Sequence, residues 1–192
     1  MGTRMWRKMR SVPGTSLRTA ARMVWLIAAL TIAGCAVPPP PGAPAPPRVE
    51  IVTTDSRAFQ YGRSGVETFN NPAINEKARL LFGSDWGTIG GRGRLATVAA
   101  PEFFLKSSEP RLVKIEEWEY IAIQGCVPKA CASHRGLMLI RSDGERLLAR
   151  LDEGGFTHYY AFGAGMGEMS QQWAAVDAAW RAIERASGWL AG

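Results

Sequence analysis

The chain has only two histidines and three cysteines among its 192 residues, and its longest uncharged apolar run is short. With two histidines and no Gly-x-Ser-x-Gly motif, a serine-hydrolase triad has little support. The apolar run Met23–Ala33 falls well short of the about 20 residues that a membrane-spanning helix needs. The sequence therefore disfavours both a serine hydrolase of that kind and a protein anchored by this run.

The chain also lacks a charge excess outside its N-terminus, although its formal net charge is +6. Residues 1–35 carry six Arg and Lys side chains and no acidic one, which leaves 17 basic and 17 acidic side chains in residues 36–192. A neutral remainder does not have the electrostatic footprint of a nucleic-acid-binding domain. Nucleic acid is therefore excluded as an expected partner.

Two glycine-rich stretches lack the residues that nucleotide binding requires. Residues 87–93 contain no Lys-Ser or Lys-Thr pair, so they do not form a phosphate-binding loop. The stretch Gly163–Gly167 is followed by Glu168, where a dinucleotide fingerprint needs its third glycine. Both stretches are predicted to be loops, and no cofactor is expected.

The N-terminal segment has the pattern of an export signal. A positively charged region precedes the apolar run, and small residues follow it. The end of the run, Ile32-Ala33-Gly34-Cys35, resembles the lipobox of bacterial lipoproteins. The resemblance implies that the signal peptide 1–34 is removed and that Cys35 carries acyl chains, several of which together anchor a protein stably. An ordinary signal peptide with a chance cysteine is the alternative.

The residue after Cys35 is Ala36, which in bacterial lipoproteins implies sorting to the outer membrane. We therefore expect a periplasmic protein that is lipid-anchored to the outer membrane. Seven of the twelve prolines lie in Ala36–Pro47, and such a segment adopts an extended, semi-rigid conformation. Residues 35–47 are predicted to be a lipidated cysteine and a tether, and residues 48–192 a single domain.

Residues 48–192 predict an α+β fold. Apolar runs separated by short turn signals predict antiparallel strands. A short helix is expected after Asn71, which is a good N-cap, with Gly83 after its last turn. Apolar residues at helical spacing predict a long amphipathic C-terminal helix, capped by Ser170 and packed on the sheet. The predicted fold is a central antiparallel sheet flanked by helices, with strands at 112–115, 118–124, 137–140, 146–151 and 156–162 and helices at 72–82 and 170–186.

An odd number of cysteines in an exported protein raises the question of which thiol is unpaired. Cys35 is assigned to lipid, which leaves Cys126 and Cys131 in a compartment that oxidises thiols. We predict a disulfide between them. Together with Pro128, this bond would hold residues 127–130 as a stiff hairpin tip, which loses little entropy on entering a groove.

Zinc binding is the alternative for these cysteines. Cys126, Cys131, His134 and His158 include two sulfurs and two imidazoles, a donor set that zinc accepts. The spacing lacks the two-residue gap usual in zinc knuckles, and the export signal favours oxidation. A thioredoxin-like site is excluded, because that motif has two residues between its cysteines rather than four.

The segment Gly125–Arg135, with the sequence Gly-Cys-Val-Pro-Lys-Ala-Cys-Ala-Ser-His-Arg, resembles the signature of the Ivy-type inhibitors of vertebrate lysozyme. Those proteins carry a Cys-Lys-Pro-His-Asp-Cys loop on a central antiparallel sheet flanked by helices. The similarity extends roughly over residues 70–152. The matching positions are Cys126, Pro128 and Cys131. Val127, Lys129 and Ala130 stand where the family has Lys, His and Asp.

The resemblance implies that the loop enters the active-site groove of a lysozyme or of another peptidoglycan-cleaving enzyme such as a lytic transglycosylase. In the family the loop His contacts two catalytic carboxylates, and here the ammonium of Lys129 would take that position. The expected target-binding residues are Val127, Pro128, Lys129 and Ala130. We expect no catalytic residue and no metal in this chain. A non-inhibitory structural or interaction lipoprotein of the cell envelope is the alternative.

Overall fold

The computed structural model describes residues 45–52, 55–87, 96–165 and 169–187. Residues 45–192 form one compact unit. The predicted signal peptide, Cys35 and most of the proline-rich tether lie outside the described residues. No helix of the described part is both long and apolar enough to cross a membrane.

The compact unit is built on one seven-stranded sheet in which every pairing is antiparallel. The strand order is β1-β3-β4-β5-β6-β7, and β2 pairs with the end of β4 that β3 leaves uncovered. The predicted antiparallel sheet is confirmed. Its strands are β1 (Val49–Val52), β2 (Lys106–Ser107), β3 (Arg111–Ile115), β4 (Trp118–Cys126), β5 (His134–Arg141), β6 (Leu147–Glu153) and β7 (Phe156–Phe162).

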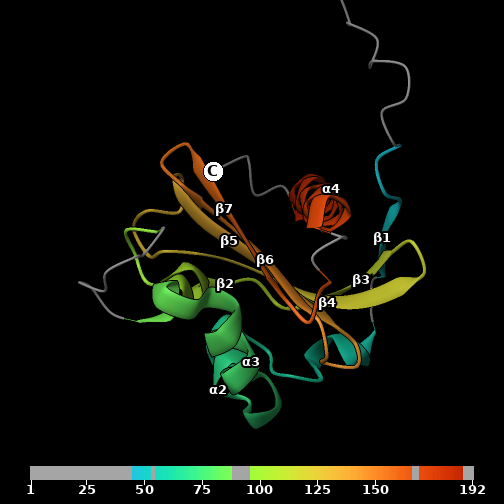
Figure 1. Ribbon diagram of the computed structural model, residues 1–192, viewed down its shortest axis with the longest axis horizontal. Coiled ribbons are helices and arrows are strands. Elements are labelled where there is room, and N and C mark those ends of the chain that lie inside the picture. The colour runs from blue at the N-terminus through green and yellow to red at the C-terminus, as the bar shows by residue number, and fades with distance from the viewer. Residues whose placement is uncertain (1–44, 53–54, 88–95, 166–168, 188–192) are drawn as a thin grey trace, which may run out of the picture. The chain divides into compact units, whose positions relative to one another are not determined.

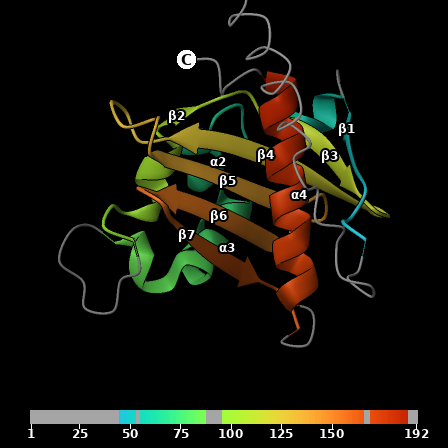
Figure 2. The same ribbon diagram turned by 90° about the horizontal axis from the view of Figure 1, so that it is seen from above.

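Helices cover both faces of this sheet. The long helix α4 (Met169–Ser187) lies across one face, and α2 (Gly65–Asn70) and α3 (Pro72–Phe82) lie on the other, as Figures 1 and 2 show. The described residues also form three short 3-10 helices: η1 (Ser56–Phe59), η2 (Gly83–Trp86) and η3 (Ala100–Phe104).

Each face of the central strands packs into a separate core. Ile121 and Ile123 of β4 belong to the core that α2 and α3 cover, whereas Ala122 lies in the core beneath α4. In β5, Met138 likewise faces the first core and Leu139 the second. Burial on both faces explains why these strands appear in the sequence as continuous apolar runs rather than as alternating ones.

The helix α4 is held to the sheet by apolar packing and by a partly buried polar contact. Val176, Trp180 and Ile183 lie in the core beneath the helix, as the apolar stripe predicts. Asp177 accepts hydrogen bonds from Arg150 at 2.9 Å and from the Tyr159 hydroxyl at 2.7 Å. Burial and this hydrogen bond raise the pKa of Tyr159 to about 12.

The signals for the short helix are confirmed, but one signal for the long helix is wrong. Asn71 caps α3, because its side-chain oxygen accepts the N–H of Ala73 at 2.9 Å, and Gly83 follows the last turn with a positive φ of 53°. Ser170 is not the cap of α4, because the helix begins at Met169 and Ser170 lies within its first turn.

Gly125, near the end of β4, allows the chain around η3 to approach the sheet closely. A Cβ atom at this position would lie 2.6 Å from the carbonyl oxygen of Phe103 and 2.8 Å from the Cα of Phe104. Backbone atoms cannot move aside as the end of a flexible side chain can. A residue with no side chain is therefore required one position before Cys126.

We predict that Gly125→Ala lowers the free energy of unfolding by about 1–3 kcal/mol, the usual penalty for overpacking. Gly87→Ala is the control, because nothing lies within 4 Å of the Cβ it would add. Urea denaturation of both variants beside the wild type measures the difference. Equal stability of Gly125→Ala and the wild type would show that the contact is loose.

Candidate functional site

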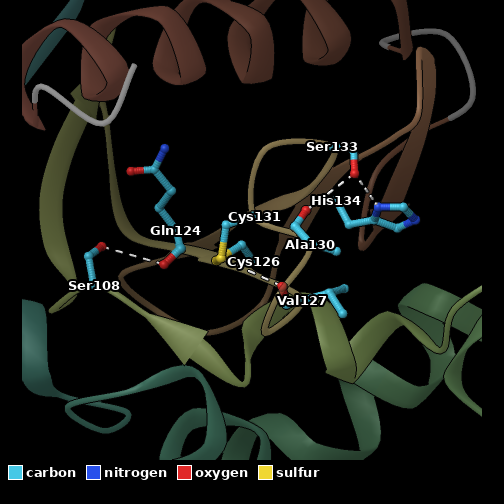
Figure 3. The surroundings of a disulfide bond; sticks show 8 residues. All are labelled: Ser108, Gln124, Cys126, Val127, Ala130, Cys131, Ser133 and His134. Carbon is cyan, nitrogen blue, oxygen red and sulfur yellow. Dashed lines mark hydrogen bonds between the residues drawn. A yellow bond between two sulfur atoms is a disulfide. The ribbon is translucent and has the colours of Figure 1, made fainter. Parts of the chain in front are cut away.

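The candidate site is the six-residue ring that a disulfide between Cys126 and Cys131 closes at the end of the β4–β5 hairpin (Figure 3). Cys126 is the last residue of β4 and is fully buried, whereas Cys131 is half-buried. Their Cα atoms lie 4.9 Å apart. Cys126 thus fixes the disulfide in the core, and Cys131 connects it to the loop beyond the ends of β4 and β5.

A tight turn forms the tip of the ring. The N–H of Ala130 donates to the carbonyl of Val127 at 3.0 Å, with Pro128 and Lys129 as the two central residues. Lys129 has a φ of 70°. Proline followed by a residue with positive φ is the pattern of a type II turn, which usually has glycine or asparagine at the second central position. A lysine there costs about 1–2 kcal/mol in backbone strain.

Further backbone hydrogen bonds brace the ring behind this turn. The carbonyl of Ala130 accepts the N–H groups of Ser133 at 3.0 Å and of His134 at 2.8 Å. The N–H of Val127 donates to the carbonyl of His134 at 3.1 Å, which continues the ladder of the hairpin. The disulfide and these backbone hydrogen bonds therefore order the loop together.

The four predicted target-binding residues differ in exposure. Pro128 and Lys129 are exposed at the tip, whereas Val127 and Ala130 are half-buried. Val127 packs against the core that α2 and α3 cover. Lys129 forms no ion pair with any residue that the structure describes. The outward surface of the ring is therefore a proline beside one free cation.

A polar cluster lies beneath the ring. Glu153, the last residue of β6, is buried and accepts hydrogen bonds from the backbone N–H and the hydroxyl of Thr97, the former at 2.9 Å to Oε2. His134 Nε2 lies 3.5 Å from one carboxylate oxygen of Glu153, and His158 Nε2 lies 3.7 Å from the other. The only two histidines of the chain therefore meet at one buried carboxylate.

Hydrogen bonding stabilises the charged form of this carboxylate. Burial by itself would raise the pKa of Glu153, but the hydrogen bonds from Thr97 and the proximity of His134 outweigh it, and the pKa lies below its ordinary value of 4.5. His134 also contacts the ring, because its backbone N–H donates to the carbonyl of Ala130 at 2.8 Å. Its Nδ1 lies 2.8 Å from the hydroxyl of Ser133, just beyond the ring (Figure 3). The cluster thus connects the base of the ring to β6.

The helix α4 contacts Arg135, which lies beside the ring at the start of β5. Arg135, the residue paired with Cys126 across the hairpin, donates from its guanidinium to Glu184 of α4 at 2.7 Å. The same guanidinium lies 5.3 Å from the centre of the Trp180 ring. Both partners of the ion pair are largely shielded from water. The C-terminal helix α4 therefore stabilises β5, the strand that follows the ring.

The four residues considered for zinc are separated by their bonding in the structure. The sulfurs of Cys126 and Cys131 are joined to each other, and His134 and His158 face Glu153. Within the described ranges no group of three or more His, Cys, Asp and Glu side chains has an arrangement suited to a metal ion. The two sulfurs therefore serve the ring in this structure rather than a metal.

Sequence reasoning did not identify Glu153, Thr97 or the Arg135–Glu184 pair as parts of this site. Glu153 precedes a Gly-Gly turn, so the sequence suggests a solvated position for it. Only the register of β5 with β6, which pairs His134 with Glu153, brings the carboxylate beneath the ring. The contact with α4 joins residues 49 positions apart, and no local pattern signals it.

Comparisons of the chain with protein-family models, with curated proteins and with solved structures found no match.

We predict that Glu153→Gln lowers the free energy of unfolding at pH 7 by about 1–3 kcal/mol, because hydrogen bonds to a charged acceptor are lost. The folded-state pKa of Glu153 lies below 4.5, so its stabilisation is complete above that pH and is lost as the pH falls through the lower folded value. The difference between wild type and variant should therefore shrink in acid.

Chemical denaturation at a series of pH values between neutrality and strong acid measures this difference. Glu117→Gln, at an exposed position in the β3–β4 turn, is the matched control and should change little at any pH. A wild-type advantage over Glu153→Gln that persists unchanged in acid would contradict the assignment.

Proposed function

We propose that this chain is a lipid-anchored periplasmic inhibitor of a peptidoglycan-cleaving enzyme and that the ring 126–131 enters the catalytic groove of its target. The observation that carries the proposal is the free cation of Lys129 at the apex of a braced, outward-facing ring. Glycan-cleaving enzymes place two carboxyl groups about 5–9.5 Å apart around the scissile bond. An ammonium presented at a convex tip has a charge and shape suited to such a groove.

The order of the ring supports this proposal energetically. A protein loop that becomes fixed on binding loses conformational entropy, which subtracts from its affinity. The backbone of this ring is fixed before any partner is bound. The disulfide, the turn at Pro128 and the backbone hydrogen bonds of Ala130, Ser133 and His134 fix it. Contact with a target therefore costs mainly the ordering of the Lys129 side chain.

The proposal includes a place for the N-terminal segment. Acylation of Cys35 would hold the chain at the inner surface of the outer membrane, and the proline-rich tether would separate the compact unit from the lipid. In the sequence resemblance, Lys129 occupies the position of the family histidine. In this proposal the chain acts by occlusion and carries out no chemistry of its own.

The test is inhibition of turnover. The chain from residue 36 onward, which contains the whole compact unit, would be titrated against a c-type lysozyme and a lytic transglycosylase. We expect inhibition of at least one enzyme and a loss of about tenfold or more for Lys129→Ala, because truncating one partner of a desolvated ion pair costs about 2–5 kcal/mol. Inhibition of neither enzyme would refute the proposal in favour of a non-inhibitory envelope protein.

Two further variants separate the charge of Lys129 from the shape of the ring. Lys129→Gly removes the ammonium but suits the positive φ of this position, so it should fold well and inhibit as poorly as Lys129→Ala. Lys114→Ala, at an exposed position of β3, should inhibit like the wild type. Undiminished inhibition by both Lys129 variants would retain the function but exclude the ammonium as its cause.

Removal of the disulfide tests the contribution of the ring itself. We predict that Cys126→Ala/Cys131→Ala lowers the free energy of unfolding by about 2 kcal/mol, the value that chain entropy gives for a loop this short. If the double variant remains folded by circular dichroism, its inhibition constant should rise, because the loop must then be ordered on binding. An unchanged inhibition constant in a folded double variant would show that backbone hydrogen bonds suffice.

A further inference from the structure

The ring shares its end of the sheet with the turn between β6 and β7. Because consecutive strands are antiparallel, the β4–β5 and β6–β7 connections emerge at the same end, as Figure 2 shows. A hydrogen bond joins them, since the N–H of Gly154 donates to the carbonyl of Ser133 at 3.0 Å. We call the exposed residues of these two connections the ring-end surface: Pro128, Lys129, Ala132, Ser133, Gly154, Gly155, Phe156 and Thr157.

Phe156 is the most exposed large apolar side chain in the described part of the chain, with 72% of its surface accessible. A single exposed apolar residue is common on proteins and has no meaning by itself. Here it borders a hollow of about 280 Å³ that residues of both connections line, among them Ala132, Ser133 and Gly155. Aromatic side chains beside concave surfaces are frequent anchors of protein interfaces.

The exposed lysines at this end of the sheet carry positive charge. Lys129 and Lys106, which is paired in register with Cys126, are both exposed. The carboxylates here are engaged within the molecule: Asp152 accepts hydrogen bonds from Arg150, and Glu153 accepts them from Thr97. Asp152 and Arg135 both line the hollow, and Asp152 is also paired with Arg150. The exposed charge that is left without an ion-pair partner among the described residues of this end is that of Lys129 and Lys106, which is complementary to an acidic partner.

We infer that the ring-end surface docks on the target through Phe156 as well as through Lys129, and that Phe156 contacts the wall of the enzyme groove into which the ring inserts. This inference rests on the proposed function. Sugar rings combine apolar C–H faces with polar hydroxyls, and small-molecule grooves are accordingly lined by aromatic and apolar side chains around a few polar groups. A partner of this chemistry offers carboxylates for Lys129 and an apolar wall for Phe156.

A lipid bilayer is the other surface that attracts cations and aromatic rings. The hollow beside Phe156 favours a protein, because a side chain of a protein partner fills a concavity that a smooth lipid surface leaves empty. The hydrogen bond between Gly154 and Ser133 also fixes the turn relative to the ring. The two anchors can therefore engage one rigid partner together.

The experiment uses Phe156→Ser in the chain from residue 36 onward, with Leu80→Ser as its matched control. Leu80 is 63% exposed on α3, a helix that contacts the β5–β6 turn at the opposite end of the sheet through the ion pair of Lys77 with Glu145. Both substitutions therefore remove an exposed apolar side chain. Inhibition and dissociation rate would be measured with the enzyme that the wild type inhibits. We expect Phe156→Ser to weaken inhibition by about tenfold, mainly through faster dissociation, and Leu80→Ser to change it less than about twofold.

Four outcomes overturn the inference, and each has a distinct pattern. Wild-type inhibition that is weakened by Lys129→Ala but not by Phe156→Ser removes the second anchor and leaves the proposed function intact. Equal losses for Phe156→Ser and Leu80→Ser indicate a general effect of surface polarity. In a third outcome, the wild type sediments with vesicles of phosphatidylcholine and phosphatidylglycerol, and only Phe156→Ser abolishes this sedimentation while inhibition is unchanged. That pattern would show that Phe156 binds lipid rather than the enzyme. If the wild type inhibits neither enzyme, the proposed function and this inference fail together.

Discussion

The position of the ring depends on the burial of β4 on both of its faces. Ile121 and Ile123 enter the core beneath α2 and α3, and Ala122 enters the core beneath α4. A shift of the strand by one residue would exchange these sets and place each side chain against the wrong layer. The register with β3 and β5 is therefore fixed, and the buried Cys126 ends the strand at a defined point. The ring begins immediately beyond that point.

Much of this fold follows from local patterns in the sequence. The β5–β6 hairpin has the turn signal Asp143-Gly144 between apolar runs, and the β3–β4 hairpin lies where the apolar alternation breaks at Glu116-Glu117. The helix α3 has both an N-cap and a terminating glycine. Elements that depend on distant partners could not be recognised in this way. The edge strand β1 has only four residues and obtains its register from β3, whose paired residues lie 60 to 66 positions later. The six-residue α2 has a Ser64–Glu67 capping pair but is too short for a periodic pattern.

The candidate site likewise combines residues that are contiguous in the sequence with residues that only the fold brings together. The two cysteines, Pro128 and the exposed Lys129 are contiguous, so the chemistry of the ring could be read directly from the chain. The groups that hold it come from segments separated by tens of residues: Glu153 through the register of β6, Thr97 through its hydrogen bonds, and Glu184 through α4. The exposed ring is therefore encoded by a contiguous motif, whereas its internal support is encoded only by the completed sheet.

The support of the ring has a consequence for the residue at its apex. None of the groups that fix the backbone of the tip is the side chain of residue 129: the disulfide, the proline and the amides of Ala130, Ser133 and His134 do so. Any residue that tolerates a φ of 70° can be placed there without refolding the loop. The architecture thus separates the support of the backbone from the chemistry of the apex, and exchange of one side chain would change the group that the tip exposes while the shape of the loop is kept.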